Sequence, residues 1–284
     1  MESVRESVHG SVRAVLIDID GVLTVSWEPL PGAVEALREI REAGLGVALV
    51  TNTTSRTRAS IAGTLREAGF AVDADDILTA PVATAAYLAE QCPGARCVLL
   101  NSGDIREDLD GVALLDPADV GPEAVDPEHV ESVPDVVIVG GAGPEFDYDA
   151  LNRAFGYLQR GARLVAVHRN LYWRTEAGLQ LDSGAFLVGL EQAARTEAEV
   201  TGKPSAAFFE AGLARLGVGA GEALMVGDDI ESDVLAAQRA GITGVLVKTG
   251  KYLPETHRDA SGTPDHVIES FADLPGLLRG SAEE

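Results

Sequence analysis

Carboxylates gather at the ends of two apolar stretches of the chain, Asp18 and Asp20 in LIDIDG and Asp228 in VGDD. Ionised carboxylates are costly to bury unless they are paired, protonated or bound to a metal. Residues two apart on a strand point to the same side, so Asp18 and Asp20 can face one ligand together. Their oxygens, with those of Asp228, suit a hard cation such as Mg²⁺.

Groups that suit a phosphate occur elsewhere in the sequence. Thr51 and Asn52 end another apolar run and offer a hydroxyl, an amide and backbone N–H groups near an expected helix start. Lys203, in TGKPS, is one of only three lysines in the chain and supplies a compact positive charge. Carboxylates, a cation, a lysine and backbone donors together make up the chemistry of phosphoryl transfer.

Each of these motifs also has a structural explanation when it is taken alone. Asp and Gly favour turns, the VTN sequence could end a strand and cap a helix, and the acids of GDDIESD could stabilise a helix N-terminus. The order of the motifs and their shared position at strand ends favour the functional interpretation.

Buried strands and amphipathic helices alternate around these residues. Apolar runs at 14–20, 45–52, 222–229 and 244–250 are typical of strands buried on both faces, and the last run ends at Lys248 and Thr249. Helical periodicity follows at 31–44, 57–70, 205–218 and 231–242. The pattern predicts an α/β fold with a Rossmann-like parallel sheet, in which sites form beyond the carboxyl ends of the strands.

The middle of the chain has strands and helices of its own. Strand patterns at 95–100, 135–141 and 162–168 accompany helical patterns at 82–91 and 147–161. They predict an inserted α/β domain over residues 79–182, with the core formed by 1–78 and 183–284. The acidic segment 115–135, which contains prolines, is expected to be a loop.

Composition excludes some classes of function. The formal net charge of the 284-residue chain is −23, which argues against nucleic acid as a partner because phosphate binding needs clustered cations. No apolar run approaches a membrane span, and the N-terminal residues do not resemble a signal peptide. We therefore expect a cytoplasmic protein without a membrane partner.

Four segments, DIDGV, VTN, GKP and GDDIESD, resemble the motifs of the haloacid dehalogenase-type hydrolases and occur in the same order. The resemblance covers nearly the whole chain. The insertion between the second and third motifs is similar to the large α/β cap of the branch that includes NagD-like and phospholysine phosphohistidine inorganic pyrophosphate phosphatase-like enzymes. The resemblance implies a parallel-sheet core with an inserted cap.

The resemblance also implies catalytic roles. Asp18 would be the nucleophile that forms an aspartyl-phosphate. Asp20 would protonate the leaving group and then activate the hydrolytic water. Lys203 would hold the charge of the nucleophile and the phosphate, while Thr51 and Asn52 would bind the phosphoryl group.

The same resemblance implies the Mg²⁺ ligands. Asp18 and Asp228 would bind the ion through their carboxylates, and Asp20 through its main-chain carbonyl. Asp229 and Asp233 would support the metal, partly through water molecules.

The inserted cap is expected to set the choice of substrate. Candidate specificity residues lie in VHRNLYWRTEAG, where His168, Arg169 and Asn170 follow a strand and Arg174 lies shortly after. The arginines could pair with an anionic substrate or be solvated surface residues. We expect His168 to be a loop or packing residue rather than a catalytic one, since Asp20 fills the acid–base role.

The sequence therefore predicts a Mg²⁺-dependent phosphatase that acts on a small phosphorylated metabolite. The resemblance adds a homodimer formed through the cap. An alternative is a phospho-accepting signalling or binding protein with little turnover. The acid–base group Asp20 and the large insertion argue against that alternative.

Overall fold

The computed structural model describes residues 12–116, 133–175 and 178–280. The chain divides into two compact units. The first unit comprises Met1–Thr51, Arg58–Leu78 and Lys203–Glu284, and the second comprises Asn52–Thr57 and Thr79–Gly202.

A six-stranded sheet forms the centre of the first unit, with the strand order β15-β14-β13-β1-β4-β5. Strand β1 pairs in parallel with both β13 and β4, and β14 pairs in parallel with β13 and β15. The strands are β1 (Ala14–Asp18), β4 (Gly46–Thr51), β5 (Ile77–Thr79), β13 (Ala223–Gly227), β14 (Thr243–Val247) and β15 (His266–Ile268). A central parallel strand is covered on both faces, which explains why every residue of β1 is apolar except its last, Asp18.

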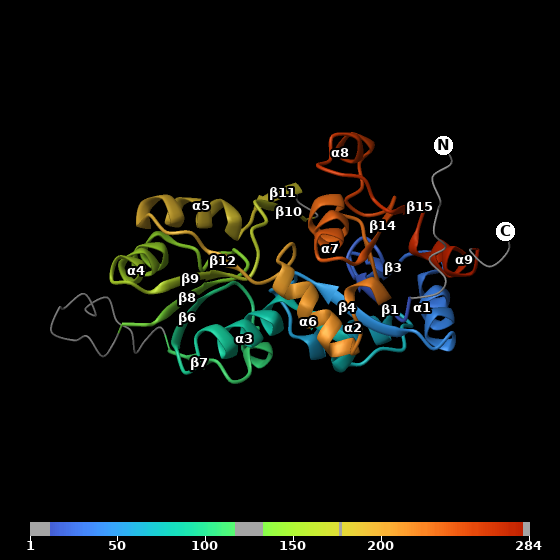
Figure 1. Ribbon diagram of the computed structural model, residues 1–284. Helices are drawn as coiled ribbons and strands as arrows, with labels where there is room; N and C mark the ends of the chain where they lie inside the picture. The colour runs from blue at the N-terminus through green and yellow to red at the C-terminus, as the bar shows by residue number, and fades with distance from the viewer. Residues whose placement is uncertain (1–11, 117–132, 176–177, 281–284) are drawn as a thin grey trace. The chain divides into compact units, whose positions relative to one another are not determined.

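Helices cover both faces of this sheet (Figure 1). Val15 and Ile17 belong to a core that α1 and α2 share with the C-terminal segment, whereas Leu16 faces Gly212 of α6 on the opposite side. The alternation is the period of two expected of a strand. The helices are α1 (Ala33–Glu42), α2 (Arg58–Glu67), α6 (Ala206–Leu216), α7 (Ala236–Arg239), α8 (Pro254–Arg258) and α9 (Leu274–Arg279).

The segment after β13 differs from the single helix expected over 231–242. It begins as a π-helix, η7 (Ile230–Leu235), and continues as the short helix α7. Asp229 caps η7 by accepting hydrogen bonds from the backbone of Glu231 and Ser232. A π-turn is wider than an α-turn and commonly marks a functional site. Here it contains the buried Asp233.

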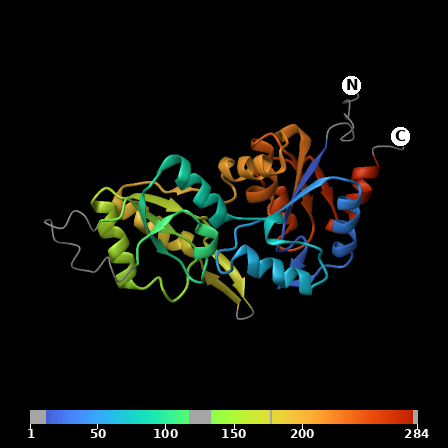
Figure 2. The same cartoon turned by 90° about the horizontal axis from the view of Figure 1, so that it is seen from below.

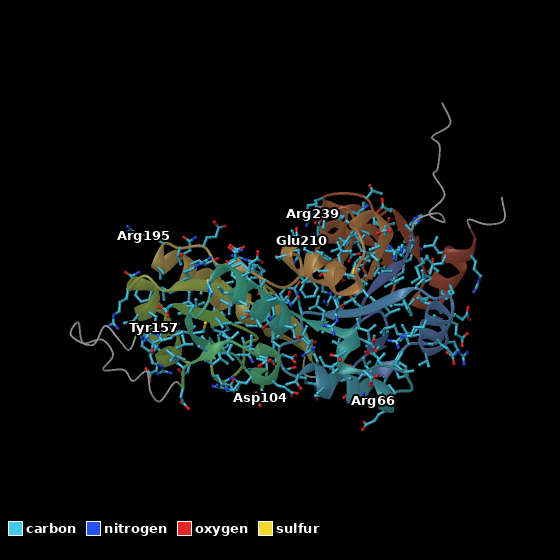
Figure 3. All side chains as sticks on the ribbon, turned by 60° about the horizontal axis from the view of Figure 1, so that its bottom comes forward. Arg66, Asp104, Tyr157, Arg195, Glu210 and Arg239 are labelled. Atoms are coloured by element: carbon cyan, nitrogen blue, oxygen red, sulfur yellow. The ribbon has the colours of Figure 1, made fainter. Side chains whose placement is uncertain are left out.

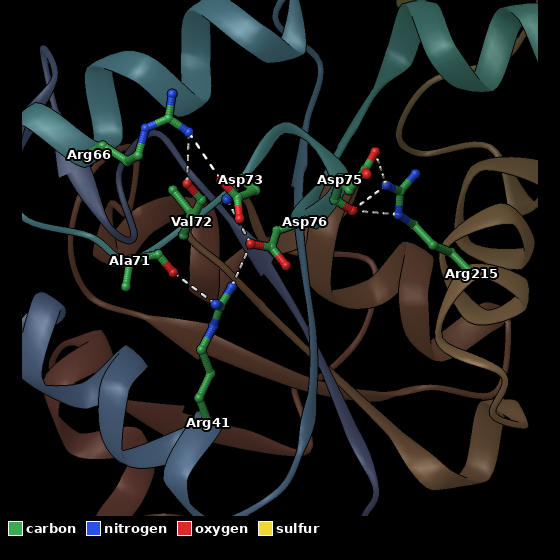
Figure 4. A network of polar contacts seen from close by, with 8 residues as sticks. All are labelled: Arg41, Arg66, Ala71, Val72, Asp73, Asp75, Asp76 and Arg215. Carbon is green, nitrogen blue, oxygen red and sulfur yellow. Dashed lines mark hydrogen bonds and ion pairs between the residues drawn. The ribbon is translucent and has the colours of Figure 1, made fainter.

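Three arginines from different helices hold the connection between α2 and β5 (Figure 4). Arg41 of α1 donates to the carbonyl of Ala71 over 2.8 Å and pairs with Asp76. Arg66 of α2 pairs with Asp73, and Arg215 of α6 donates to the carbonyl of Asp75. The acidic loop is thereby tied to both faces of the sheet.

The second unit contains a five-stranded sheet with the order β12-β9-β8-β6-β7. Helices α4 and α5 pack together on one face, and α3 lies on the other (Figures 1 and 2). The elements are α3 (Ala80–Gln91), β6 (Arg96–Leu100), β7 (Ala113–Leu114), β8 (Val136–Val139), α4 (Tyr148–Gln159), β9 (Arg163–Ala166), α5 (Ser183–Ala194) and β12 (Glu199–Val200). Most of the acidic segment predicted as a loop, 115–135, lies outside the described residues.

The end of the second unit differs from the boundary expected at 182, whereas its main segment begins at Thr79. Leu187 and Leu190 of α5 share a core with Val137 and Val139 of β8, so this helix belongs to the second unit. The unit therefore ends at Gly202. The short segment 52–57 also belongs to it, because Asn101 donates a hydrogen bond to the carbonyl of Thr54.

Two hairpins complete the fold. In the first unit β2 (Thr24–Val25) pairs with β3 (Glu28–Pro29), and in the second β10 (Tyr172–Thr175) pairs with β11 (Gly178–Leu181). Charged side chains such as Arg66, Glu210 and Arg239 lie on the exposed surface (Figure 3). Among the described residues, no helix has the length and apolar character needed to cross a membrane.

Candidate active site

The candidate site of the first unit begins at the carboxyl end of β1. Asp18 is the last residue of that strand and is buried, whereas Asp20 lies in the following turn and is exposed. The turn needs Gly21, which has a φ of 87°. A Cβ atom at Gly21 would also overlap the carboxylate of Asp228. The glycine therefore lets the first and fourth motifs approach each other closely.

Lys203 links two buried carboxylates. Its ammonium nitrogen lies 2.7 Å from Asp18 Oδ1 and 2.7 Å from Asp233 Oδ1. Burial acts to lower the pKa of Lys203, but the two carboxylates outweigh burial and raise it. The lysine thus stays charged and holds the Asp18 carboxylate in a fixed orientation.

Asp228 is the carboxylate of the site whose negative charge the protein stabilises least. Its Oδ2 accepts the backbone N–H of Lys251 over 2.6 Å, while its buried Oδ1 has no hydrogen-bond partner among the described residues. Burial, reinforced by the negative charges of Asp18 and Asp233, raises the pKa of Asp228 to about 8. The carboxylate is therefore poorly stabilised as an anion by the protein alone.

These carboxylates fit a divalent cation. Asp18, Asp228 and Asp233 each offer an oxygen, and the three oxygens lie within 4.8 Å of one another. Three carboxylates against the single buried Lys203 leave an excess of negative charge, and the orphaned Asp228 oxygen is a free ligand. Carboxylate oxygens are the donors that Mg²⁺ takes.

The arrangement differs in part from the expected ligand set. Asp18 and Asp228 come together as expected, and Asp233 brings its own carboxylate into the cluster and also pairs with Lys203. The Asp229 carboxylate instead caps the π-helix. The side chain of Asp20 is not part of the cluster.

Thr51 lies beside Asp18 at the sheet edge, because Val50 of β4 pairs with Asp18 of β1. Helix α2 begins at Arg58, close to the expected start at 57, so the segment 52–57 separates Thr51 from the helix. The backbone donors near Thr51 and Asn52 therefore belong to a loop. Asn52 itself is assigned to the second unit.

The candidate specificity residues of the second unit have partners of their own. Arg169 makes two hydrogen bonds, of 2.9 and 2.6 Å, to the carboxylate of the buried Glu191. His168 is buried, and its Nε2 lies 3.9 Å from Asp182.

The remaining two candidates are Asn170 and Arg174. Asn170 is exposed, and its backbone N–H donates to His168 Nδ1. Arg174 lies in β10, but its side chain is outside the described residues.

Sequence reasoning missed Gly250 and Lys251. Gly250 follows the polar end of the fourth apolar run, and a Cβ atom there would overlap Asp228 Oδ2. The Thr249 hydroxyl donates to the carbonyl of Gly21. The available signal was the polar sequence KTGK after a buried strand, of which only Lys248 and Thr249 were singled out.

Comparison with known proteins identifies the family. A model of haloacid dehalogenase-like hydrolases matches residues 15–114, and a related HAD hydrolase-like model matches residues 200–274. Haloacid dehalogenase-like hydrolase domain-containing protein 2 of Homo sapiens is 35% identical over 261 residues, which cover 92% of this chain and 93% of that protein. The chain belongs to the haloacid dehalogenase-like hydrolases.

One further relative has a name that states an activity, and a solved structure shares the fold. Phospholysine phosphohistidine inorganic pyrophosphate phosphatase of Bos taurus is 34% identical, with 96% of each chain covered. The structure of NagD from E. coli K-12 matches with a TM-score of 0.80 at 28% identity, covering 93% of this chain and 98% of NagD. The predicted family and the α/β fold with an inserted cap are thus confirmed, and the chain is an enzyme of the hydrolase class.

Proposed function

We propose that this hydrolase is a Mg²⁺-dependent phosphatase that cleaves a small phosphorylated metabolite through an aspartyl-phosphate on Asp18. The observation that carries the proposal is the contact of Lys203 with both Asp18 and Asp233, beside an Asp228 oxygen that has no partner among the described residues. The name of the similar phospholysine phosphohistidine inorganic pyrophosphate phosphatase of Bos taurus supports it.

In the first step an oxygen of Asp18 attacks phosphorus, and the bond from phosphorus to the leaving oxygen breaks. Lys203 holds the Asp18 carboxylate in a fixed orientation for this attack. Asp20 gives its proton to the leaving oxygen. Desolvation raises the pKa of Asp20, although Lys251 and Lys203 oppose the shift, so this acid holds its proton to a higher pH than a free carboxyl group.

In the second step water attacks phosphorus and releases inorganic phosphate and the Asp18 carboxylate. Asp20, now ionised, accepts a proton from that water and is thereby restored. Asp18 and Asp228, with Asp233 beside them, would hold Mg²⁺. When bound, the ion supplies positive charge to the oxygens of the phosphoryl group.

The test is phosphate release from para-nitrophenyl phosphate, with Mg²⁺ and with EDTA, by the wild type and Asp18→Asn. We expect metal-dependent release that falls at least about 10³-fold in the variant, because the nucleophile is lost. Asp75→Asn is a matched control, since its side chain is 95% exposed and lies in the loop before β5. Equal rates in the wild type and Asp18→Asn would refute the proposed nucleophile.

A mass measurement separates turnover from signalling. Under turnover conditions a phosphatase that hydrolyses its intermediate quickly carries little phosphate on Asp18. A protein that accumulates phosphate on Asp18 and releases none would instead be the phospho-accepting module considered from the sequence.

A further inference from the structure

The loop that follows β14 is built into the site of the first unit. The Thr249 hydroxyl bonds to the Gly21 carbonyl, and Gly250 packs so tightly against Gly21 and Asp228 that neither glycine leaves room for a side chain. The next backbone N–H, that of Lys251, donates to Asp228 Oδ2 over 2.6 Å. The backbone of Lys251 is therefore held in place next to Asp228.

The three lysines of the chain have different surroundings. Lys203 is buried, and its ammonium is occupied by Asp18 and Asp233. Lys248 pairs with Glu269 over 2.6 Å at the surface. Lys251 is exposed and, within the part of the chain that the structure describes, forms no ion pair.

The backbone of Lys251 lies close to the turn that contains Asp20. Gly250, which directly precedes Lys251, packs against Gly21, which directly follows Asp20. The loop after β14 and the turn after β1 are therefore neighbours at the site, and Lys251 leaves the loop next to the proposed proton donor of the leaving group.

We propose that the ammonium group of Lys251 binds an anionic group on the leaving part of the substrate. The inference rests on the proposed function and deepens it. The expected substrates are phosphorylated compounds whose leaving group carries a second acidic group, which is either a carboxylate or another phosphate. Lys251 is exposed, its backbone is held next to the turn that contains Asp20, and its ammonium has no carboxylate partner in the described chain, so it is suited to such an anion.

The experiment compares two substrates of similar shape, phenyl phosphate and 4-carboxyphenyl phosphate. The readout is the ratio of their kcat/KM values in the wild type, Lys251→Met, Lys251→Arg and Lys248→Met. We expect the wild type to prefer the carboxylated compound and Lys251→Met to lower the ratio about tenfold, the size of one charge-assisted contact. Lys251→Arg should keep most of the preference, and Lys248→Met should keep all of it.

A ratio that is unchanged in Lys251→Met would overturn the proposal. So would an equal loss for both substrates, which would place Lys251 on the transferred phosphoryl group. Thermal unfolding of each variant separates a lost contact from a lost fold.

A binding measurement keeps the inference testable even if the proposed function fails. Calorimetry at a fixed Mg²⁺ concentration compares pyrophosphate with orthophosphate on the wild type and on Lys251→Met. We expect the wild type to bind pyrophosphate more tightly and the variant to lose about tenfold of that preference. A wild type that hydrolyses neither aryl phosphate but shows this loss would refute the phosphatase and retain the anion site. Equal preferences in both proteins would refute the anion site.

Discussion

Two groups of charged residues in the same chain are stabilised in different ways. In the first unit Asp18, Asp228 and Asp233 lie together with one buried lysine, and an oxygen of Asp228 has no partner in the described chain. In the second unit both carboxylate oxygens of the buried Glu191 have hydrogen-bond partners. They accept two hydrogen bonds from Arg169 and one from the backbone N–H of Ala198.

The contrast distinguishes a site from a scaffold. Buried polar groups are normally satisfied within the protein, and a group left unsatisfied indicates a missing ligand or a catalytic role. By this criterion the carboxylates at the sheet edge of the first unit form a site that fits a cation. The Arg169–Glu191 pair needs nothing further to be stable.

The largest expected effect comes from Lys203→Met. The substitution removes the cation that pairs with both Asp18 and Asp233 and leaves these two buried carboxylates without it. We expect the free energy of unfolding in EDTA to fall by about 3–5 kcal/mol and phosphate release with Mg²⁺ to fall about 10²–10³-fold. Urea unfolding and the para-nitrophenyl phosphate assay measure the two effects. A variant as stable as the wild type would show that the first unit is not strained by its charges.

Asp228→Asn should have the opposite effect on stability without metal. Burial raises the pKa of Asp228 above its unfolded value, so the folded protein binds this proton more tightly than the unfolded chain does. The resulting stability is fully present below about pH 4 and is lost as the pH rises through about 8. In EDTA at pH 8 the variant should therefore melt about 2–4 °C above the wild type, a gain of about 1 kcal/mol.

Addition of Mg²⁺ should reverse this order. The ion should stabilise the wild type more at pH 8 than at pH 6 and should have little effect on Asp228→Asn. Thermal unfolding at both pH values, with and without the ion, makes the comparison. Equal stabilisation of both proteins would argue against Asp228 as a ligand.

The sequence allowed correct predictions for features that depend on the pairing of backbone strands. Asp18 and Thr51 were expected at neighbouring strand ends because parallel strands place their carboxyl ends at one edge, and register brings them there. The π-helix that contains Asp233 could not be anticipated, since an apolar period near 3.6 does not distinguish α from π turns.

Contacts between side chains that lie far apart in the chain were harder to predict from the sequence. Arg169 and Glu191 are separated by 22 positions, and no local pattern connects them. Lys251 was missed for a related reason, because its closeness to Asp228 depends on two glycine backbones in contact rather than on its own residue type.

The Arg169–Glu191 pair of the second unit tests whether the two groups of charged residues differ in function as well as in stabilisation. If Arg169 serves only to neutralise Glu191, then Arg169→Met should lower the free energy of unfolding by about 1–3 kcal/mol. Glu191→Gln should cost a similar amount, and the double variant should cost less than the sum. Activity toward para-nitrophenyl phosphate should change less than about threefold. A large rise in KM without a loss of stability would instead make Arg169 a substrate-binding residue, which is one of the two interpretations that the sequence left open.

The smallest effect is expected in the arginine network of the first unit. Arg41 both donates to the Ala71 carbonyl and pairs with Asp76, whereas the pairing of Arg66 with Asp73 is largely exposed, with side-chain exposures of 51% and 86%. Arg41→Ala should lower the free energy of unfolding by about 1 kcal/mol, and Arg66→Ala by about 0.5 kcal/mol or less. Urea unfolding at low and high salt separates the two contributions, because salt weakens an exposed ion pair more than a hydrogen bond to a carbonyl. A cost of several kcal/mol for Arg41→Ala would mean that this loop, too, depends on a buried charge and would extend the strained region well beyond the carboxylate cluster.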